Sequence, residues 1–206
     1  VALAEVHTRN LAQAVDLSLS SMVKRIDQAL ITVAAETERS TAAGGLDRPA
    51  LERFVKVQEK LVPEAVAIRI TDSEGSVIVN TPNGDPAVSL RDRPFWAHLR
   101  DSPEAAVFIT RPILGSFTNQ YVIVSARRYN LPDGRFGGAV VLPVYVKGLQ
   151  DTLAGFDLGA GGMLTLRDGE GGFVTRVPNE VKGQALAVGS PEDSSDLNGF
   201  LAAGTW

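Results

Sequence analysis

The sequence contains no cysteine, and this absence removes several kinds of chemistry at once. Thiolate metal sites, thiol catalysis and disulfide bonds all require that side chain. Histidine is almost as scarce, because only His7 and His98 are present, and neither belongs to a His/Asp/Glu group with the spacing of metal ligands. The acidic turn Asp72-Ser73-Glu74-Gly75 lacks the distal glutamate of a calcium loop. We therefore expect neither a metal centre nor a cofactor.

Motifs of common enzyme classes are missing too. The sequence has no Gly-x-Ser-x-Gly elbow for a nucleophilic serine. The glycines at 159–162 precede a predicted strand instead of joining a strand to a helix, so they do not form a phosphate-binding fingerprint. A triad of His98 with Ser116 or Ser125 has no support from spacing. We expect a chain without catalytic residues.

Excess positive charge and long apolar runs are also absent. The chain has 20 Lys and Arg against 24 Asp and Glu, a net charge of -4, so no nucleic-acid partner is expected. No apolar run reaches the ~18 residues that a membrane-spanning helix needs. Because the sequence begins with Val1 and ends at Trp206 within an apolar stretch, we predict a fragment of a longer protein whose membrane anchors lie outside it.

The first forty residues contain few helix breakers and predict one long helix that ends at Gly44-Gly45. Apolar residues recur along it at alternating intervals of four and three: Val15, Leu19, Met22, Ile26, Ala29 and Val33. Val23 and Leu30 add a second stripe beside this seam. Such a helix can pair with the same helix of a second copy or simply pack on its own domain. A second helix is predicted over 48–60, with Pro49 near its start.

From residue 66 the apolar period changes to two, which is typical of half-buried strands. Residues 66–71 and 76–80 form a predicted hairpin, and residues 93–100 form a predicted short helix. Three further strands are expected over Val107–Arg111, Gln120–Arg128 and Phe136–Tyr145. This order indicates an α+β domain, with a five-stranded antiparallel sheet flanked by helices.

The hairpin occurs twice in the sequence. "IRITDSEGSVIVNT" at 68–81 returns as "LTLRDGEGGFVTRV" at 164–177, after a predicted connecting helix over 146–153. A repeated hairpin favours two similar domains in tandem. The second domain has no closing strands before Trp206, so we predict that it is incomplete. The expected division is 1–60 for the two helices, 61–150 for the first domain and 151–206 for the partial second one.

Cationic and aromatic residues gather in "SLRDRPFWAHLRDSPEAAVFITRP" and in the strands that follow. Arginine binds a carboxylate through two parallel hydrogen bonds, and Trp and Tyr offer apolar walls with polar tips. In the opposing interpretation Asp92 caps a salt-bridged helix entry and Phe95 belongs to the core. The residues predicted to bind a ligand are Arg93, Phe95, Trp96, His98, Arg111, Tyr121, Ser125, Arg127 and Tyr145.

The sequence resembles the double Cache (tandem PDC, PAS-like) extracellular sensor domains of bacterial histidine kinases, diguanylate cyclases and chemoreceptors. The resemblance covers nearly the whole chain. It is carried by the long first helix, the 68–81 hairpin, and the segments "RDRPFWAHLRDSP", "YVIVSARRYNLPDGRFGGAVVLPVYV" and "DLGAGGMLTLRDGEGGFVTRVP".

The resemblance implies two PAS-like lobes, of which the first is membrane-distal and holds the ligand, and a long helix that mediates parallel dimers. Amino-acid-binding members carry an Arg-x-Trp-Tyr-like element, and Arg93-Pro94-Phe95-Trp96 stands in its place here. Those members also place an aspartate at the end of the last strand, where this chain has Pro143-Val144-Tyr145. The resemblance therefore implies a carboxylate or other small polar ligand in preference to an α-amino acid.

We expect, on these grounds, the extracytoplasmic ligand-sensing domain of a membrane receptor, with a histidine kinase as the first parent and a diguanylate cyclase as the second. The main alternative is a ligand-free dimerisation or protein-interaction module of such a receptor. That alternative expects a filled, apolar first lobe, whereas a sensor needs a pocket there.

Overall fold

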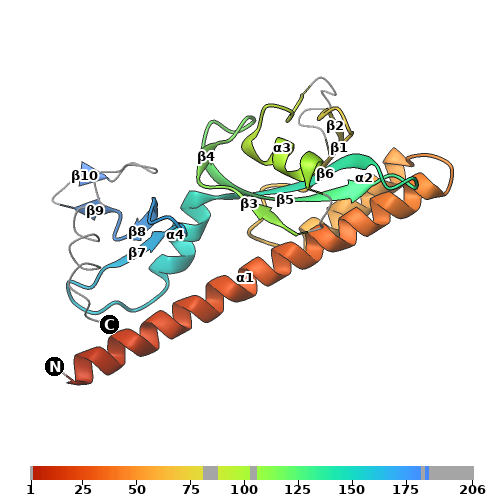
Figure 1. Ribbon diagram of the computed structural model, residues 1–206. Coiled ribbons are helices and arrows are strands. Elements are labelled where there is room, and N and C mark those ends of the chain that lie inside the picture. Colours follow the sequence, from red (N-terminus) through yellow and green to blue (C-terminus); the bar gives the residue numbers. More distant parts are fainter. Residues whose placement is uncertain (1, 81–87, 103–105, 182–183, 186–206) are drawn as a thin grey trace. The chain divides into compact units, whose positions relative to one another are not determined.

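The computed structural model describes residues 2–80, 88–102, 106–181 and 184–185 (Figure 1). The chain divides into two compact units, one of Leu17–Tyr145 and a smaller one of Val1–Asp16 with Val146–Trp206. Helix α1 (Ala2–Ala42) contributes to both units, whereas the sequence predicted the helices as a segment of their own.

The larger unit is built on one antiparallel sheet with the strand order β2-β1-β6-β5-β3, and β4 also pairs with β5. The strands are β1 (Arg69–Thr71), β2 (Val77–Val79), β3 (Phe108–Ile109), β4 (Ile113–Leu114), β5 (Tyr121–Asn130) and β6 (Phe136–Tyr145). This sheet has six strands rather than the predicted five, and β4 is the addition. Both β3 and β4 pair with the long β5, and Pro112 between them has no N–H to continue the ladder.

The two faces of this sheet carry different cores because side chains alternate along each strand. On one face, buried residues of β1 and β6 pack with helices α1 and α2 (Arg48–Glu59), and the core includes Leu30, Val33, Leu51, Val55, Ile68, Ile70, Val140 and Leu142. On the other face lies helix α3 (Pro94–Asp101), and that core includes Phe95, Trp96, Leu99, Val122, Val124, Ala139 and Val141. The α+β class and the helix-flanked antiparallel sheet are thus confirmed (Figure 1).

The apolar seam of α1 packs on the sheet of its own chain from Met22 onward. Ile26, Ala29 and Val33 are buried in the core beneath the sheet, and Met22 packs against it. Leu30 of the second stripe is fully buried in the same place. The sequence left two interpretations open for this seam, pairing with a second copy or packing on the chain's own domain. From Met22 onward the seam packs on its own domain, and the dimer stays a prediction.

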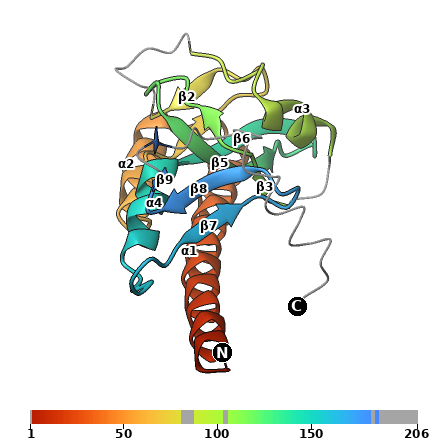
Figure 2. The ribbon, with the colours of Figure 1, turned by 90° about the vertical axis from the view of Figure 1, so that its left-hand side faces the viewer.

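The smaller unit contains helix α4 (Val146–Ala154) and the hairpin of β7 (Leu164–Arg167) and β8 (Phe173–Val177), as the sequence predicted (Figure 2). The short strands β9 (Glu180–Val181) and β10 (Gln184–Ala185) form a second antiparallel pair. The expected absence of closing strands concerns residues 186–206, which lie outside the described residues.

The repeated sequence motif makes the same turn in both units. The Oδ1 atom of Asp72 accepts hydrogen bonds from the backbone N–H groups of Glu74 and Ser76, both at 2.9 Å. Asp168 does the same with Glu170 at 3.0 Å and Gly172 at 2.7 Å. These carboxylates therefore serve the turn, as turn chemistry predicts for aspartate at this position.

Candidate ligand-binding site

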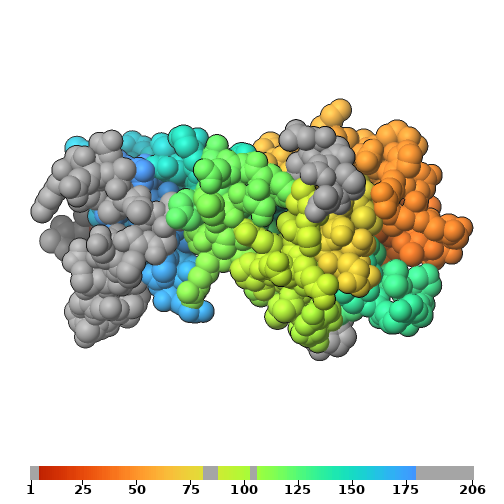
Figure 3. Space-filling model, turned by 90° about the horizontal axis from the view of Figure 1, so that it is seen from above, coloured from red at the N-terminus to blue at the C-terminus, as the bar shows by residue number. Residues whose placement is uncertain are grey.

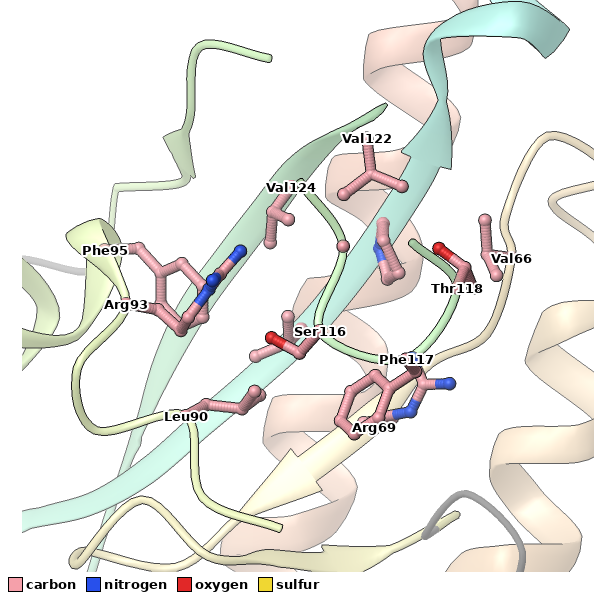
Figure 4. A pocket seen from close by; sticks show the side chains of 13 residues that line it. Val66, Arg69, Leu90, Arg93, Phe95, Ser116, Phe117, Thr118, Val122 and Val124 are labelled. Atoms are coloured by element: carbon pink, nitrogen blue, oxygen red, sulfur yellow. The ribbon is translucent and has the colours of Figure 1, made fainter. Parts of the chain in front are cut away.

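A cavity lies on the α3 side of the sheet in the larger unit (Figure 4). Its volume is about 40 Å³, on a measure by which a single water needs ~10–15 Å³. The lining residues come from the segment that leads into β1 and the first residue of that strand, the entry to α3, the turn after β4, the first half of β5 and the second half of β6. They are Val66, Arg69, Leu90, Arg93, Phe95, Gly115, Ser116, Phe117, Thr118, Val122, Val124, Val141 and Pro143.

Most of the cavity wall is apolar. Val122 and Val124 of β5 and Val141 of β6 project from the sheet, and they alternate with residues that face α1. Leu90 and Phe95 close the side nearest α3. Such a wall suits a ligand with an apolar portion.

Arg69 is the most buried of the polar residues that line the cavity. Its neighbours Ile68 and Ile70 point into the α1 core, so the pleat of β1 turns Arg69 to the cavity face. The residue is 8% exposed, and its Nε–H has no hydrogen-bond partner in the described part of the chain. The guanidinium carbon lies 4.5 Å from the centre of the Phe117 ring. Burial lowers the pKa of the Arg69 side chain, and the charges of Glu59 and Tyr145 oppose that shift.

Phe117 and Thr118 reach the cavity from the turn between β4 and β5. Two backbone hydrogen bonds close this turn, from Gly115 N to Gln120 O at 2.8 Å and from Asn119 N to Gly115 O at 3.3 Å. The Thr118 hydroxyl is buried and has no partner among the residues that the structure describes. A Cβ atom on Gly115 would lie 2.7 Å from that hydroxyl, so glycine leaves the room that Thr118 occupies.

Arg93 stands at the entry to α3, and its Nη2 donates a hydrogen bond of 2.7 Å to the Leu114 carbonyl. It therefore ties the α3 segment to β4, and Figure 3 shows these two segments next to each other in yellow-green and bright green. Arg93 itself occupies the N-cap position without a side-chain capping bond, so the expectation that Asp92 caps this helix is wrong. Arg91 instead forms an exposed ion pair with Glu74 at 3.3 Å.

Of the nine residues predicted to bind a ligand, Arg93 and Phe95 line the cavity. Trp96 is 2% exposed within the α3 core, where its ring meets Phe136 edge-on at 5.2 Å. His98 is exposed, with its ring 4.7 Å from that of Phe108. Arg111 is exposed between β3 and β4, and Tyr145 is half-buried at the end of β6. None of these four is among the residues that line the cavity.

The three predicted residues on β5 face away from the cavity. Tyr121, Ser125 and Arg127 alternate with the cavity residues Val122 and Val124, so the pleat directs them to the α1 side. Arg127 donates to Oδ1 of Asp27 on α1, at 2.7 Å from Nη2 and 3.3 Å from Nε. This placement makes Arg127 a link between the sheet and the helix.

We expect the substitution Asp27→Asn to lower the free energy of unfolding by about 1–3 kcal/mol, because it leaves a largely buried guanidinium without its counter-charge. Urea denaturation of the purified chain measures this change. The matched control is Glu36→Gln, which breaks the surface pair with Arg39 and is expected to leave the free energy of unfolding nearly unchanged. Equal losses in the two variants would contradict a special role for the link between Asp27 and Arg127.

No group of three or more metal-ligating side chains lies close together in the described ranges. Within the same ranges, no helix combines the length and the apolar character needed to cross a bilayer.

The chain matches no protein-family model and no curated protein. Solved structures do match it. The extracellular domain of a protein assigned as a histidine kinase, rpHK1S-Z16, is 23% identical with a TM-score of 0.77, and the match covers 90% of this chain and 76% of that one. The sensory domain of the Campylobacter jejuni chemoreceptor Tlp3 with isoleucine bound is 13% identical with a TM-score of 0.72, covering 98% and 81%. The ligand-binding domain of the Pseudomonas fluorescens chemoreceptor CtaA with L-serine is 17% identical with a TM-score of 0.60, covering 79% and 67%.

The chain therefore has the fold of bacterial extracellular sensor domains, which confirms the double-Cache fold implied by the sequence resemblance. The match extends through most of this chain, so it includes both units and not the larger one alone.

Proposed function

We propose that this chain is the extracytoplasmic ligand-sensing domain of a membrane receptor and that a small polar or carboxylate ligand binds in the larger unit. One observation carries the proposal: a cavity with an apolar wall and a buried arginine opens on the sheet of a sensor fold. Apolar pockets with a few convergent polar groups are the usual form of small-molecule sites. The ligand-free alternative expects a filled lobe, so the cavity argues against it.

The location and the parent belong to the same proposal. The similar solved structures are extracellular or sensory domains, and this supports a periplasmic or extracellular position with membrane anchors outside the 206 residues. A histidine kinase is the proposed parent, because the rpHK1S-Z16 domain has the higher identity and TM-score of the three compared. A chemoreceptor or a diguanylate cyclase is the alternative parent.

The signal would leave the larger unit through α1. The sheet is a single layer between the cavity and the α1 core. In β1, Arg69 faces the cavity and Ile70 faces α1, as does Ile68 just before the strand. A ligand that binds more tightly to one position of β1 than to another would therefore change how the isoleucines beside Arg69 pack against α1. Sensors of this kind need a difference in affinity between two states of only about 1–3 kcal/mol.

A thermal-shift screen of the purified chain against small carboxylates, amino acids and polyols tests the proposal. A ligand at ~100 times its Kd stabilises the folded state by about 2.7 kcal/mol, so a binder raises the melting midpoint with its concentration. The variant Arg93→Ala is expected to lose that shift. Tyr121→Ala is the control, because Tyr121 is 44% exposed on the opposite face of the sheet.

A screen in which no compound raises the midpoint, followed by calorimetry in which none of them binds, would favour the ligand-free module. A shift that survives in Arg93→Ala and disappears in Tyr121→Ala would place the site elsewhere.

A further inference from the structure

We propose that the cavity binds the carboxylate of a small monocarboxylic acid that lacks an α-ammonium group, with Arg69 as the principal anion-binding residue. The inference rests on the proposed sensing function, and it names the chemical class of the ligand and the residue that recognises it.

The surroundings of Arg69 leave the N–H donors along the edge of its guanidinium available to a ligand. The ring of Phe117 covers one face of the guanidinium at 4.5 Å, and stacking of this kind holds the plane in place while the N–H donors remain along its edge. The Nε–H is one of these donors, and it is buried without a partner in the described ranges. Because an unpaired buried donor is costly, an acceptor is the group expected to meet it. A carboxylate supplies two oxygens in the geometry that a guanidinium edge prefers.

A second unpaired group stands on the same cavity wall. The hydroxyl of Thr118 is buried without a partner in the part of the chain that is described, and Thr118 follows the residue that stacks on Arg69. A hydroxyl can donate to a carboxylate oxygen, so Thr118 offers the anion another hydrogen bond. Arg93 adds a second positive charge to the lining and holds the Leu114 carbonyl through Nη2.

An ammonium group finds no acidic partner among the described residues that line the cavity. The thirteen lining residues include two arginines and no aspartate or glutamate. Glu59 is the acid whose charge acts on Arg69, but its oxygens already accept hydrogen bonds from other groups. Its Oε1 accepts from Ile68 N and Asn80 Nδ2, each at 2.7 Å, and its Oε2 accepts from Lys56 Nζ at 3.2 Å. An α-ammonium would thus be desolvated beside two guanidinium groups without a counter-charge, which selects against amino acids.

The rest of the cavity sets the size and polarity of the acid. The valines of β5 and β6 and Pro143 form an apolar wall, and the free volume of about 40 Å³ is small. A short aliphatic tail meets these surfaces without leaving a polar group unpaired. The inferred ligand class is therefore a short-chain monocarboxylate.

Calorimetric titration of the chain with 3-methylbutanoate and with L-valine tests the inference, because the two compounds differ only in the α-ammonium group. We expect 3-methylbutanoate to bind and L-valine to bind at least ~10-fold more weakly. Arg69→Gln is expected to weaken 3-methylbutanoate binding roughly 10–100-fold, since it removes a charge-assisted hydrogen bond. Thr118→Val, which keeps the side-chain shape, is expected to weaken it several-fold. The matched control is Arg100→Gln on the exposed side of α3, for which no change is expected.

The other possible results show whether the inferred ligand class, the assigned residues or the proposed sensor function is wrong. Equal or tighter binding of L-valine would overturn the selection against ammonium and leave the sensor function standing. Binding of 3-methylbutanoate that is unchanged in both Arg69→Gln and Thr118→Val would overturn the assigned residues. Binding of polyols but of neither acid would overturn the ligand class alone. The absence of binding by every compound in the wider screen would count against the sensor function itself.

Discussion

Gly138→Ala is expected to lower the free energy of unfolding of this chain by about 2–5 kcal/mol, because two costs add at one backbone position. Gly138 has a φ of +141°, which L residues rarely adopt. A Cβ atom built there would lie 2.2 Å from the Thr71 carbonyl oxygen, so β1 and β6 would have to separate. The same carbonyl accepts the hydroxyl hydrogen bond of Tyr129 at 2.8 Å, and separation of the strands would disturb that bond as well.

The matched control for this prediction is Gly134→Ala. Gly134 also has a positive φ, of +83°, but nothing lies within 4 Å of its Cβ position. It therefore carries the backbone cost alone, about 1–2 kcal/mol. Urea denaturation of both variants separates the two costs. A loss at Gly138 no larger than the loss at Gly134 would show that the close approach of the strands is not constraining.

Trp96→Ala is expected to cost about 3–5 kcal/mol of stability in the absence of any ligand, since it removes the largest side chain of the α3 core. The ring is 2% exposed and meets Phe136 edge-on, and Phe136 in turn lies 5.3 Å from the guanidinium carbon of Arg128. The loss of Trp96 would leave a cavity between α3 and the sheet. Thermal or urea unfolding of the ligand-free protein measures the effect.

The neighbouring variant His98→Ala is the control, because His98 is exposed on the same helix and its removal is expected to change stability by at most ~0.5 kcal/mol. The comparison also separates two roles for Trp96. A side chain that served only to contact a ligand would be nearly neutral without that ligand, so a small loss in Trp96→Ala would contradict the core assignment.

Periodicity and turn residues together are sufficient to predict most elements of this fold. The four–three spacing of α1 and the alternation in β5 and β6 set the main helix and the central strands within a few residues. The turn residues Asp72 and Gly75 and their repeats Asp168 and Gly171 marked both hairpins. The strand β4 was missed because two residues give no period, and only the ladder to β5 defines it.

The position of the site was harder to predict than the fold. Alternation divides β5 into two sets of residues, but it does not say which set faces a helix and which faces a cavity. Ser125 and Arg127 are polar and are therefore predicted to face the ligand, whereas Val122 and Val124 of the alternate set line the cavity. Arg127 is instead held by Asp27, a partner one hundred positions away in the sequence.

Arg69 was overlooked for a related reason. An arginine that alternates with isoleucines is typical of a strand with one solvent-exposed face, so the pattern suggested an exposed side chain. The segment 115–118 and α3 cover that face, and the arginine becomes 8% exposed. The available signal is "GSFT" at 115–118, whose small and polar residues before the strand predicted from Gln120 indicate a turn but not what that turn covers.

The alternation along β1 also has a consequence for how such a sensor can diverge. Arg69 faces the cavity and its neighbours Ile68 and Ile70 face α1, so under the proposed function adjacent positions would serve ligand recognition and signal transmission separately. Substitutions on the cavity face would change which ligand binds without altering the contacts with α1. Substitutions on the other face would change the strength of the response without altering which ligand binds. The three consecutive residues 68–70 would thus offer mutation two nearly independent targets.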